Sequence, residues 1–125
     1  MLTDTRVVTE LEVNMGHERV IFNFITGHPQ DVVSDVLRSI SAYTRADRVT
    51  AFKIGITNNP ERRFKEEYDH WYSKMAVVYK SKSINSVAEL ERHLIEHNRE
   101  LADNMISGGG GREGTPPYFM YVVMR

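Results

Sequence analysis

The amino-acid sequence predicts an α+β protein with a small, mostly antiparallel central sheet flanked by helices. Short segments rich in β-branched and aromatic residues alternate along the chain with longer segments whose apolar residues recur at helical spacing. The expected order is strand, strand, helix, strand, helix, strand, helix, strand, which is typical of a sheet covered by helices. At 125 residues, with 41% hydrophobic and 26% charged residues, the chain has the size and composition of one soluble globular domain.

The first half of the chain is expected to form two strands and one helix. Residues 6–14 alternate loosely between apolar and polar side chains, and residues 19–26 are rich in β-branched and aromatic side chains. Both patterns predict strands. Apolar residues recur at helical spacing over residues 30–43, which predicts an amphipathic helix.

The second half is expected to contribute the remaining helices and strands. We predict helices over residues 60–71 and 87–102, and strands over residues 75–79 and 118–124. In the first of these helices Phe64, Tyr68 and Trp71 are three or four residues apart, so they are expected to form one packing stripe.

The most informative stretch is residues 51–64, which reads as a strand, a tight turn and the start of a helix. Its strand residues alternate in the pattern of a half-buried strand, namely Phe52, Ile54 and Ile56 with Lys53, Gly55 and Thr57. Asn59 is expected to cap the helix, and Pro60 is expected to occupy its first position. This junction places Lys53, Gly55 and Arg63 near one spot at the end of the strand.

The residues of this stretch carry a resemblance to a known family. Ile54-Gly55, Thr57, the Asn-Pro turn and the paired Arg62-Arg63 are similar to the second half of the motif of GIY-YIG nucleases. Arg63 follows Gly55 by eight residues, which is the spacing in that family. The resemblance implies one domain, 1–125, with a GIY-YIG-like core in residues 43–125 and an N-terminal extension in residues 1–42. It also implies a scissile phosphate held between a strand residue and a helix arginine.

Three basic residues are the candidates for holding that phosphate. Arg63 matches the family's helix arginine, whose guanidinium can bind two phosphate oxygens, and Arg62 could share the task. Lys53 stands where most members have their second tyrosine, and the resemblance implies that it holds water or phosphate. The alternatives are structural, because Arg63 could pair with Glu67 on the helix surface and Lys53 could keep a sheet edge charged.

The resemblance also assigns a base and a metal ligand. Tyr43 precedes Lys53 by ten residues, close to the family's spacing between its tyrosines, and is the candidate base that activates water. His70, on the same expected helix as Arg63, could assist proton transfer. Glu91 lies in a segment that resembles the family's carboxylate helix, so it is expected to hold Mg²⁺ or Mn²⁺ with waters and substrate oxygens. The alternatives are a tyrosine in the core and a glutamate on a solvated helix surface.

Further residues are expected on the substrate side of the site. Gly55 and Thr57 belong to the matched motif, and Arg112 in the glycine-rich loop 108–112 could extend a groove for DNA. That loop lacks the Lys-Ser or Lys-Thr of a nucleotide-binding phosphate loop, so a plain connection is the alternative.

The function implied by the resemblance is metal-dependent hydrolysis of phosphodiester bonds by a DNA endonuclease of the GIY-YIG type, with RNA as another substrate. A net charge of −1 lowers the expectation of a broad nucleic-acid interface. One alternative is therefore a catalytically degenerate module that binds nucleic acid or protein. Another is a small protein that handles nucleotides or phosphate ligands through the loop 108–112.

The cellular setting is predicted from what the sequence lacks. It contains no apolar run of the length of a membrane helix, no visible secretory signal and no cysteine. These features predict a cytoplasmic protein without a membrane partner. Residues 1–42 could add target choice or the contacts of a homodimer.

Overall fold

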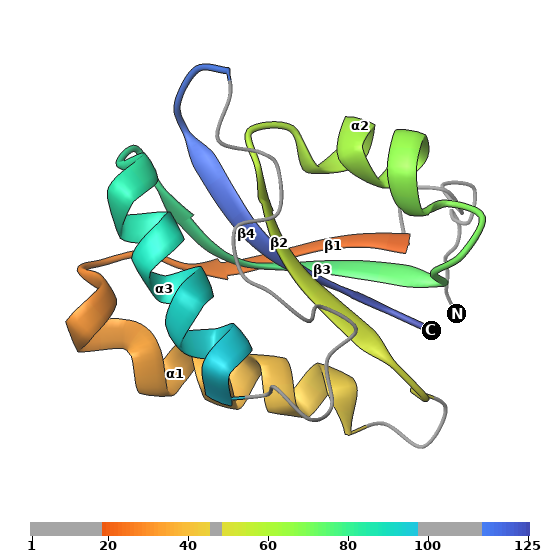
Figure 1. Cartoon of the computed structure of the whole chain (residues 1–125), viewed down its shortest axis with the longest axis horizontal. Coiled ribbons are helices and arrows are strands. Elements are labelled where there is room, and N and C mark those ends of the chain that lie inside the picture. Colours follow the sequence, from red (N-terminus) through yellow and green to blue (C-terminus); the bar gives the residue numbers. More distant parts are fainter. Residues whose placement is uncertain (1–18, 46–48, 98–113) are drawn as a thin grey trace, which may run out of the picture.

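The computed structural model describes residues 19–45, 49–97 and 114–125. Its centre is a sheet of four strands in the order β1-β3-β4-β2 (Figure 1). The strands are β1 (Val20–Ile25), β2 (Phe52–Thr57), β3 (Lys74–Ser81) and β4 (Tyr118–Met124). β4 is antiparallel to both of its neighbours, and β1 is parallel to β3. The predicted α+β architecture with a small, mostly antiparallel sheet is therefore confirmed.

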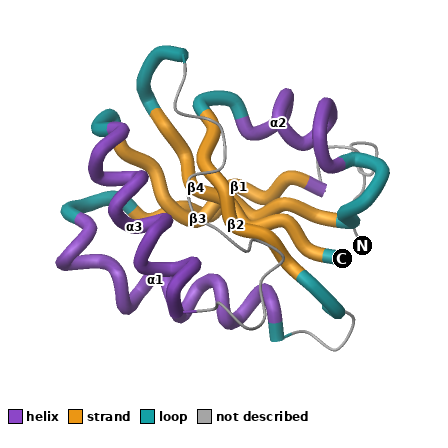
Figure 2. Tube along the Cα trace, viewed as in Figure 1, coloured by secondary structure: helices purple, strands orange, loops and turns teal. Residues whose placement is uncertain are grey.

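The helices divide between the two faces of the sheet (Figures 1 and 2). Helices α1 (Pro29–Thr44) and α3 (Ile84–His97) bury their apolar sides against one face, where Ile54 of β2 belongs to the core. The short helix α2 (Pro60–Arg63) continues into the π-helical segment η2 (Phe64–Tyr68), and both lie on the other face. There Phe64 and Tyr68 pack against β3 and β4 in a second, smaller core.

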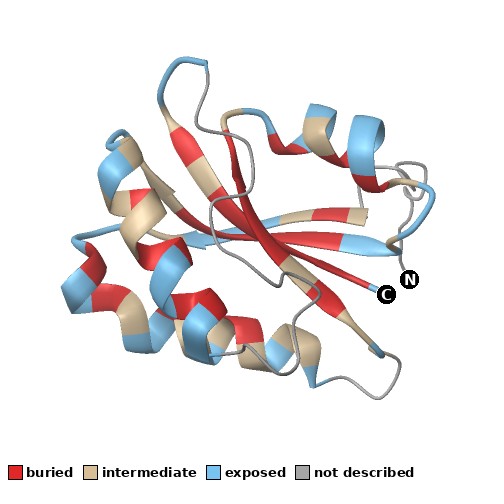
Figure 3. Cartoon of the chain, in the orientation of Figure 1, coloured by how far each residue is buried: buried red, intermediate tan, exposed pale blue. Residues whose placement is uncertain are grey.

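Alternation along the strands explains why each face has its own core. In β4, Met120 and Val122 point into the α1–α3 core, whereas Tyr121 and Val123 point into the α2–η2 core. The two central strands are consequently buried along most of their length, and β1 at one edge is largely exposed (Figure 3). This arrangement fixes which side chains can meet at a site.

The expected N-terminal extension is part of the main sheet where the structure describes it. β1 pairs with β3, with Val20 opposite Met75, and α1 packs over the sheet beside α3. The expected strand over residues 6–14 lies outside the described residues, as does the end of the helix that we expected to reach residue 102. None of the described helices combines the length and the apolar character that crossing a membrane requires.

The expected packing stripe of the helix over residues 60–71 is wrong at its end. Phe64 and Tyr68 are buried, but Trp71 is 71% exposed. The helix widens into a π turn, in which the Asp69 N–H donates to the carbonyl of Phe64 at 2.8 Å, and it ends at Tyr68. Trp71 therefore leaves the helical register that its spacing in the sequence suggested.

Candidate phosphate-binding site

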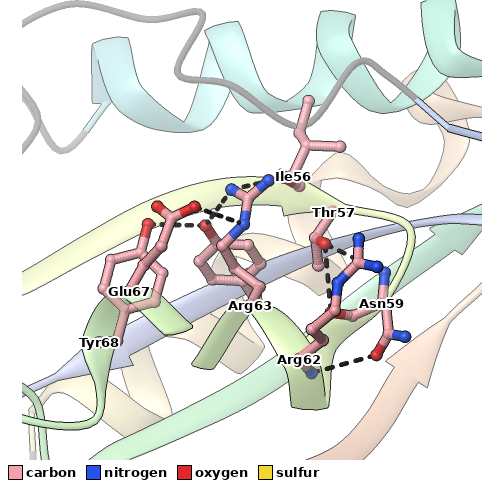
Figure 4. Close-up of polar contacts among 8 residues, drawn as sticks. Ile56, Thr57, Asn59, Arg62, Arg63, Glu67 and Tyr68 are labelled. Atoms are coloured by element: carbon pink, nitrogen blue, oxygen red, sulfur yellow. Dashed lines mark hydrogen bonds and ion pairs between the residues drawn. The ribbon is translucent and has the colours of Figure 1, made fainter. Parts of the chain in front are cut away.

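The turn between β2 and α2 is built by the side chains that its sequence predicts. The Asn59 Oδ1 atom accepts a hydrogen bond from the backbone N–H of Arg62 at 3.1 Å, and Pro60 begins the helix. Thr57 accepts from the backbone N–H of Asn59 at 3.0 Å through its Oγ1 atom. Both bonds hold the first helical turn against the end of the strand (Figure 4). Thr57 is 2% exposed, so its hydroxyl serves the turn and is not presented to a ligand.

The turn directs Arg63 back across the end of β2 (Figure 4). Its Nε lies 3.1 Å from a carboxylate oxygen of Glu67, one helical turn later. Its Nη1 donates long hydrogen bonds to the carbonyl of Ile56 at 3.5 Å and to the hydroxyl of Tyr121 at 3.4 Å. Among the described residues the contacts of the guanidinium involve Nε and Nη1, which leaves Nη2 for a ligand. The alternative role of Arg63, an ion pair with Glu67, is therefore present in the structure. It is one of several contacts that the Arg63 guanidinium makes.

Two tyrosine hydroxyls meet beside Arg63. The hydroxyl oxygens of Tyr68 and Tyr121 are 2.7 Å apart, and their rings pack edge to face with centroids 5.7 Å apart. Gly55 permits this arrangement, because a Cβ at that position would lie 2.5 Å from the Cζ atom of Tyr121. The glycine of the matched motif thus has a physical role here, which is to let a tyrosine of the neighbouring strand lie across β2.

Lys53 completes a small pocket at this place. Its ammonium lies 5.7 Å from the centre of the Tyr68 ring, within reach of a cation–π interaction. The pocket has a volume of about 110 Å³ and is lined by Lys53, Ile54, Gly55, Arg63, Glu67, Tyr68 and Tyr121. Two cations and two phenol groups therefore surround a space of a size suited to one phosphate group or a few waters. The predicted proximity of Lys53, Gly55 and Arg63 is confirmed.

Burial sets the protonation state of the tyrosine in this pocket. The pKa of Tyr121 is raised above its ordinary value of 10.0, first because the phenol is buried and second because Tyr68 lies beside it. The Arg63 guanidinium opposes this shift without cancelling it. Tyr121 consequently keeps its proton at neutral pH, and its hydroxyl accepts a hydrogen bond from Arg63 and shares another with Tyr68.

Tyr43 does not lie at this pocket. It is in α1, where its ring packs beside the core on the opposite face of the sheet, and its hydroxyl accepts a long hydrogen bond from Asn23 at 3.4 Å. The expectation that Tyr43 and Lys53 would flank one attacking water is therefore wrong. Tyr43 lies near the end of α1, which covers the other face of the sheet, so its spacing of ten residues from Lys53 does not bring the two side chains together. The structure agrees better with the alternative, in which Tyr43 packs against the core.

Glu91 is also separated from the pocket. It lies on the buried side of α3, between residues of the α1–α3 core, and it is 1% exposed. The expectation that Glu91 and Arg63 would meet around one phosphate is not met, because α3 and α2 cover opposite faces of the sheet. The solvated surface glutamate that we considered as its alternative is equally wrong.

The pocket was also tested for the divalent metal that the resemblance implies. The carboxylate lining it is Glu67, and that carboxylate is already paired with Arg63. Within the described parts of the chain no three metal-ligating side chains gather at one place. The groups around Arg63 therefore do not fit a metal site, and we derive no chemical step through a metal.

The other candidates lie outside the pocket or outside the described residues. His70 and Arg62 are both exposed, and neither lines the pocket. Arg62 contributes to the site through its backbone N–H, which the cap at Asn59 holds. Arg112 and the glycine-rich loop fall within residues 98–113, so they lie outside the described residues.

Two pocket residues were missed by sequence reasoning. Tyr121 was placed in the last strand and given no role, and Tyr68 was assigned to the core alone. The available signal was the glycine in the middle of β2, since a glycine inside a strand indicates close approach of another group. To identify Tyr121 from this glycine, one would have had to know that Gly55 pairs with Tyr121, and the two residues are far apart in the sequence.

The comparisons with known proteins add no relative. No protein-family model, no curated protein and no solved structure matches this chain. The resemblance to GIY-YIG nucleases therefore depends on the residues of the β2–α2 junction and of the segment around Glu91, and no comparison supports it.

Proposed function

We propose that this chain binds nucleic acid and that the pocket around Arg63 receives one phosphate of the backbone. The observation that carries the proposal is the convergence of the Arg63 guanidinium, the Lys53 ammonium and the Tyr121 hydroxyl on one small pocket. These groups are donors and cations, which match the oxygens and the negative charge of a phosphodiester.

The surroundings of Arg63 favour the binding of a phosphate group. Arg63 is partly buried, with 19% of its side chain exposed, so its charge is less screened than that of a fully exposed arginine. Glu67 is the more exposed partner, with 52% of its side chain accessible, and it can swing away when a phosphate takes its place. The Tyr121 hydroxyl is oriented by Tyr68 on one side and Arg63 on the other. A phosphate oxygen would thus meet groups that are already positioned.

Arg63→Ala tests this proposal directly. We expect the affinity for a short oligonucleotide at low salt to fall about tenfold to a hundredfold, because charge-assisted hydrogen bonds to a phosphate are lost. The slope of log affinity against log salt should also decrease by about one unit, for the loss of one phosphate contact. Fluorescence anisotropy at several salt concentrations measures both quantities.

Arg38→Ala is the matched control. It removes the same charge from α1 on the opposite face of the sheet, where Arg38 pairs with Asp35 at the surface. This variant should keep the affinity of the unmodified chain within about twofold. Equal losses in the two variants would mean that net charge, and not the pocket, holds the nucleic acid.

Hydrolysis of the bound phosphodiester, by an endonuclease of the GIY-YIG type, is the second candidate function. The observation that favours it is the chain of contacts from Tyr68 to Tyr121 to Arg63. As the water oxygen bonds to phosphorus and the bond from phosphorus to the leaving oxygen breaks, the hydroxyl pair could relay the proton of the water to that leaving oxygen, while the arginine neutralises the phosphoryl oxygens. Tyr121 would then take the role for which Tyr43 was expected.

Nicking of supercoiled plasmid tests the second candidate, with and without Mg²⁺ or Mn²⁺. If the chain is a nuclease of this type, Tyr121→Phe should lose at least about a hundredfold in rate, because general acid–base catalysis contributes roughly that much. The same variant should keep most of its binding. Tyr43→Phe should nick like the unmodified chain, and loss of nicking in both variants would speak against the role of Tyr121. Glu91→Gln, measured beside them, shows whether the buried carboxylate of α3 contributes to the reaction.

A further inference from the structure

A cluster of exposed aromatic side chains occupies the part of the sheet that α2 and η2 leave uncovered. Phe22 and Phe24 of β1 are 46% and 38% exposed, although phenylalanines in a strand are usually buried. Both rings meet Phe119 of β4 edge to face, with centroid distances of 6.3 Å and 6.1 Å. We call these three residues, together with Lys80 of β3, the aromatic platform.

The platform lies on the same face of the sheet as the phosphate pocket. Val20 points into the α2–η2 core, so alternation along β1 brings Phe22 and Phe24 to that face as well. Phe119 precedes Tyr121 by two residues on β4 and packs against the same core. At a rise of about 3.3 Å per residue, the two aromatic residues are about 7 Å apart along the strand. The pocket and the platform therefore lie on the same face of the sheet, next to neighbouring residues of one strand.

A cation sits in the middle of the platform. The Lys80 ammonium lies 5.3 Å from the centre of the Phe24 ring and 5.8 Å from that of Phe119. Next to it, an open groove of about 370 Å³ is lined by Thr26, Gly27, Lys80, Ser81 and Lys82. Lys80 thus contacts the aromatic rings and, together with Lys82, lines the groove next to them.

This combination of groups suits a single-stranded nucleic acid better than it suits another protein. Lysine is depleted from the buried centres of protein–protein interfaces, so a platform with Lys80 at its centre is a poor apolar contact for another protein. Exposed aromatic rings on a sheet, flanked by cations, are instead suited to unpaired nucleobases, whose faces stack on the rings while their phosphates meet the cations. In a duplex these faces are already stacked on each other and are not accessible.

We propose that the aromatic platform binds the unpaired bases of single-stranded nucleic acid, which stack on Phe22 and Phe24. The backbone of the nucleic acid then runs between the Arg63 pocket and the groove at Lys80 and Lys82. The position of one backbone phosphate rests on the function proposed above, whereas the stacking does not. Because every base has a stacking face, recognition of this kind tolerates many sequences.

The test compares four labelled probes on the full chain by fluorescence anisotropy: a single-stranded DNA of about twelve nucleotides, the same sequence as RNA, its duplex, and an abasic strand of equal length. The unmodified chain should bind the single strands at least about tenfold more tightly than the duplex and the abasic strand. The DNA and RNA probes show which of the two nucleic acids is preferred. Equal affinity for the intact and the abasic single strand would overturn the proposal.

Substitutions on the platform identify the rings that stack. Phe22→Ala and Phe24→Ala should each weaken single-strand binding by about tenfold and leave binding of the abasic strand unchanged. Phe24→Tyr should retain the affinity, because a phenol also stacks. Trp71→Ala is the matched control, since Trp71 is also an exposed aromatic residue but precedes the opposite end of β3. Unchanged single-strand binding in Phe22→Ala and Phe24→Ala would overturn the proposal.

The same measurements separate this proposal from the function on which it partly rests. If Arg63→Ala binds like the unmodified chain but the phenylalanine variants do not, the pocket assignment fails and the platform stands. If Arg63→Ala weakens binding and the phenylalanine variants do not, the platform fails and the pocket stands. The remaining alternative is that the platform is the interface of a homodimer, which light scattering tests. If Phe22→Ala and Phe24→Ala dissociate a dimer without changing the affinity for single strands, the platform binds a second copy of the chain and the proposal is overturned.

Discussion

Gly55→Ala is expected to remove nucleic-acid binding as fully as the loss of Arg63, although it adds a single methyl group. The added Cβ would lie 2.5 Å from the Tyr121 Cζ atom, well inside van der Waals contact. Tyr121 is 1% exposed and packed between β2 and η2, so its ring has little room to retreat. We therefore expect a loss of about 1–3 kcal/mol in the free energy of unfolding, measured by urea denaturation, from overpacking of this site. Displacement of the Tyr121 ring would also push against the Arg63 guanidinium, which lies 3.4 Å from the Tyr121 hydroxyl, and would move that cation away from the phosphate.

A double-mutant cycle shows whether Tyr121 is the cause. Tyr121→Val removes the ring that the new methyl group would meet and keeps a residue suited to a strand. In that background Gly55→Ala should cost much less than in the unmodified chain, and the difference is the energy of the contact. Equal costs in both backgrounds would show that Gly55 is needed for another reason, such as its backbone conformation.

Arg19→Ala is expected to destabilise the chain by about 2 kcal/mol and to weaken binding at a pocket that Arg19 does not touch. Its guanidinium donates to the Asp69 carboxylate at 2.6 Å and to the carbonyls of Asp69, Tyr72 and Ser73 at 3.1, 2.9 and 3.1 Å. It also lies 4.8 Å from the centre of the Phe64 ring. These contacts fasten the end of η2 and the turn after it to the start of β1. Without them the segment that carries Arg63 and Tyr68 would be held less firmly.

Arg19→Lys is the informative comparison, because it keeps the charge and loses the planar fork that reaches several acceptors at once. Its free energy of unfolding should fall between those of the unmodified chain and Arg19→Ala. Arg38→Ala removes an exposed pair and should cost no more than about 0.5 kcal/mol. If Arg19→Ala cost no more than that control, the anchoring role of Arg19 would be refuted.

The local features of the fold could be predicted from the sequence because short-range rules decide them. Asn59 caps the helix as its position before Pro60 suggested, and the spacing from Gly55 to Arg63 brings those residues to one pocket. A strand, a two-residue turn and a capped helix leave few alternatives over a dozen residues. The same reasoning placed Lys53 on the correct face of its strand.

The errors concern features that depend on contacts between distant parts of the chain. The partner of Gly55 is Tyr121, and strand pairing over that separation leaves no trace in local spacing, so Tyr43 was preferred because it is nearer to Lys53. Trp71 was placed in the core because the π turn before it cannot be read from periodicity. Glu91 lies on a helix as predicted, but the helical pattern did not predict its burial and does not say which face of the sheet its helix covers.

The bond between Arg63 and the carbonyl of Ile56 has a consequence for self-association. β2 is an outer strand of the described sheet, and an uncovered backbone on an outer strand would invite another chain to extend the sheet. Ile56 is 0% exposed, so its backbone is covered. The Arg63 guanidinium lies against that backbone at Ile56, and it brings a positive charge to the rim. We therefore expect the loss of Arg63 to uncover part of this edge and to leave a protein that is more prone to form fibrillar or amorphous deposits on storage, which light scattering would measure.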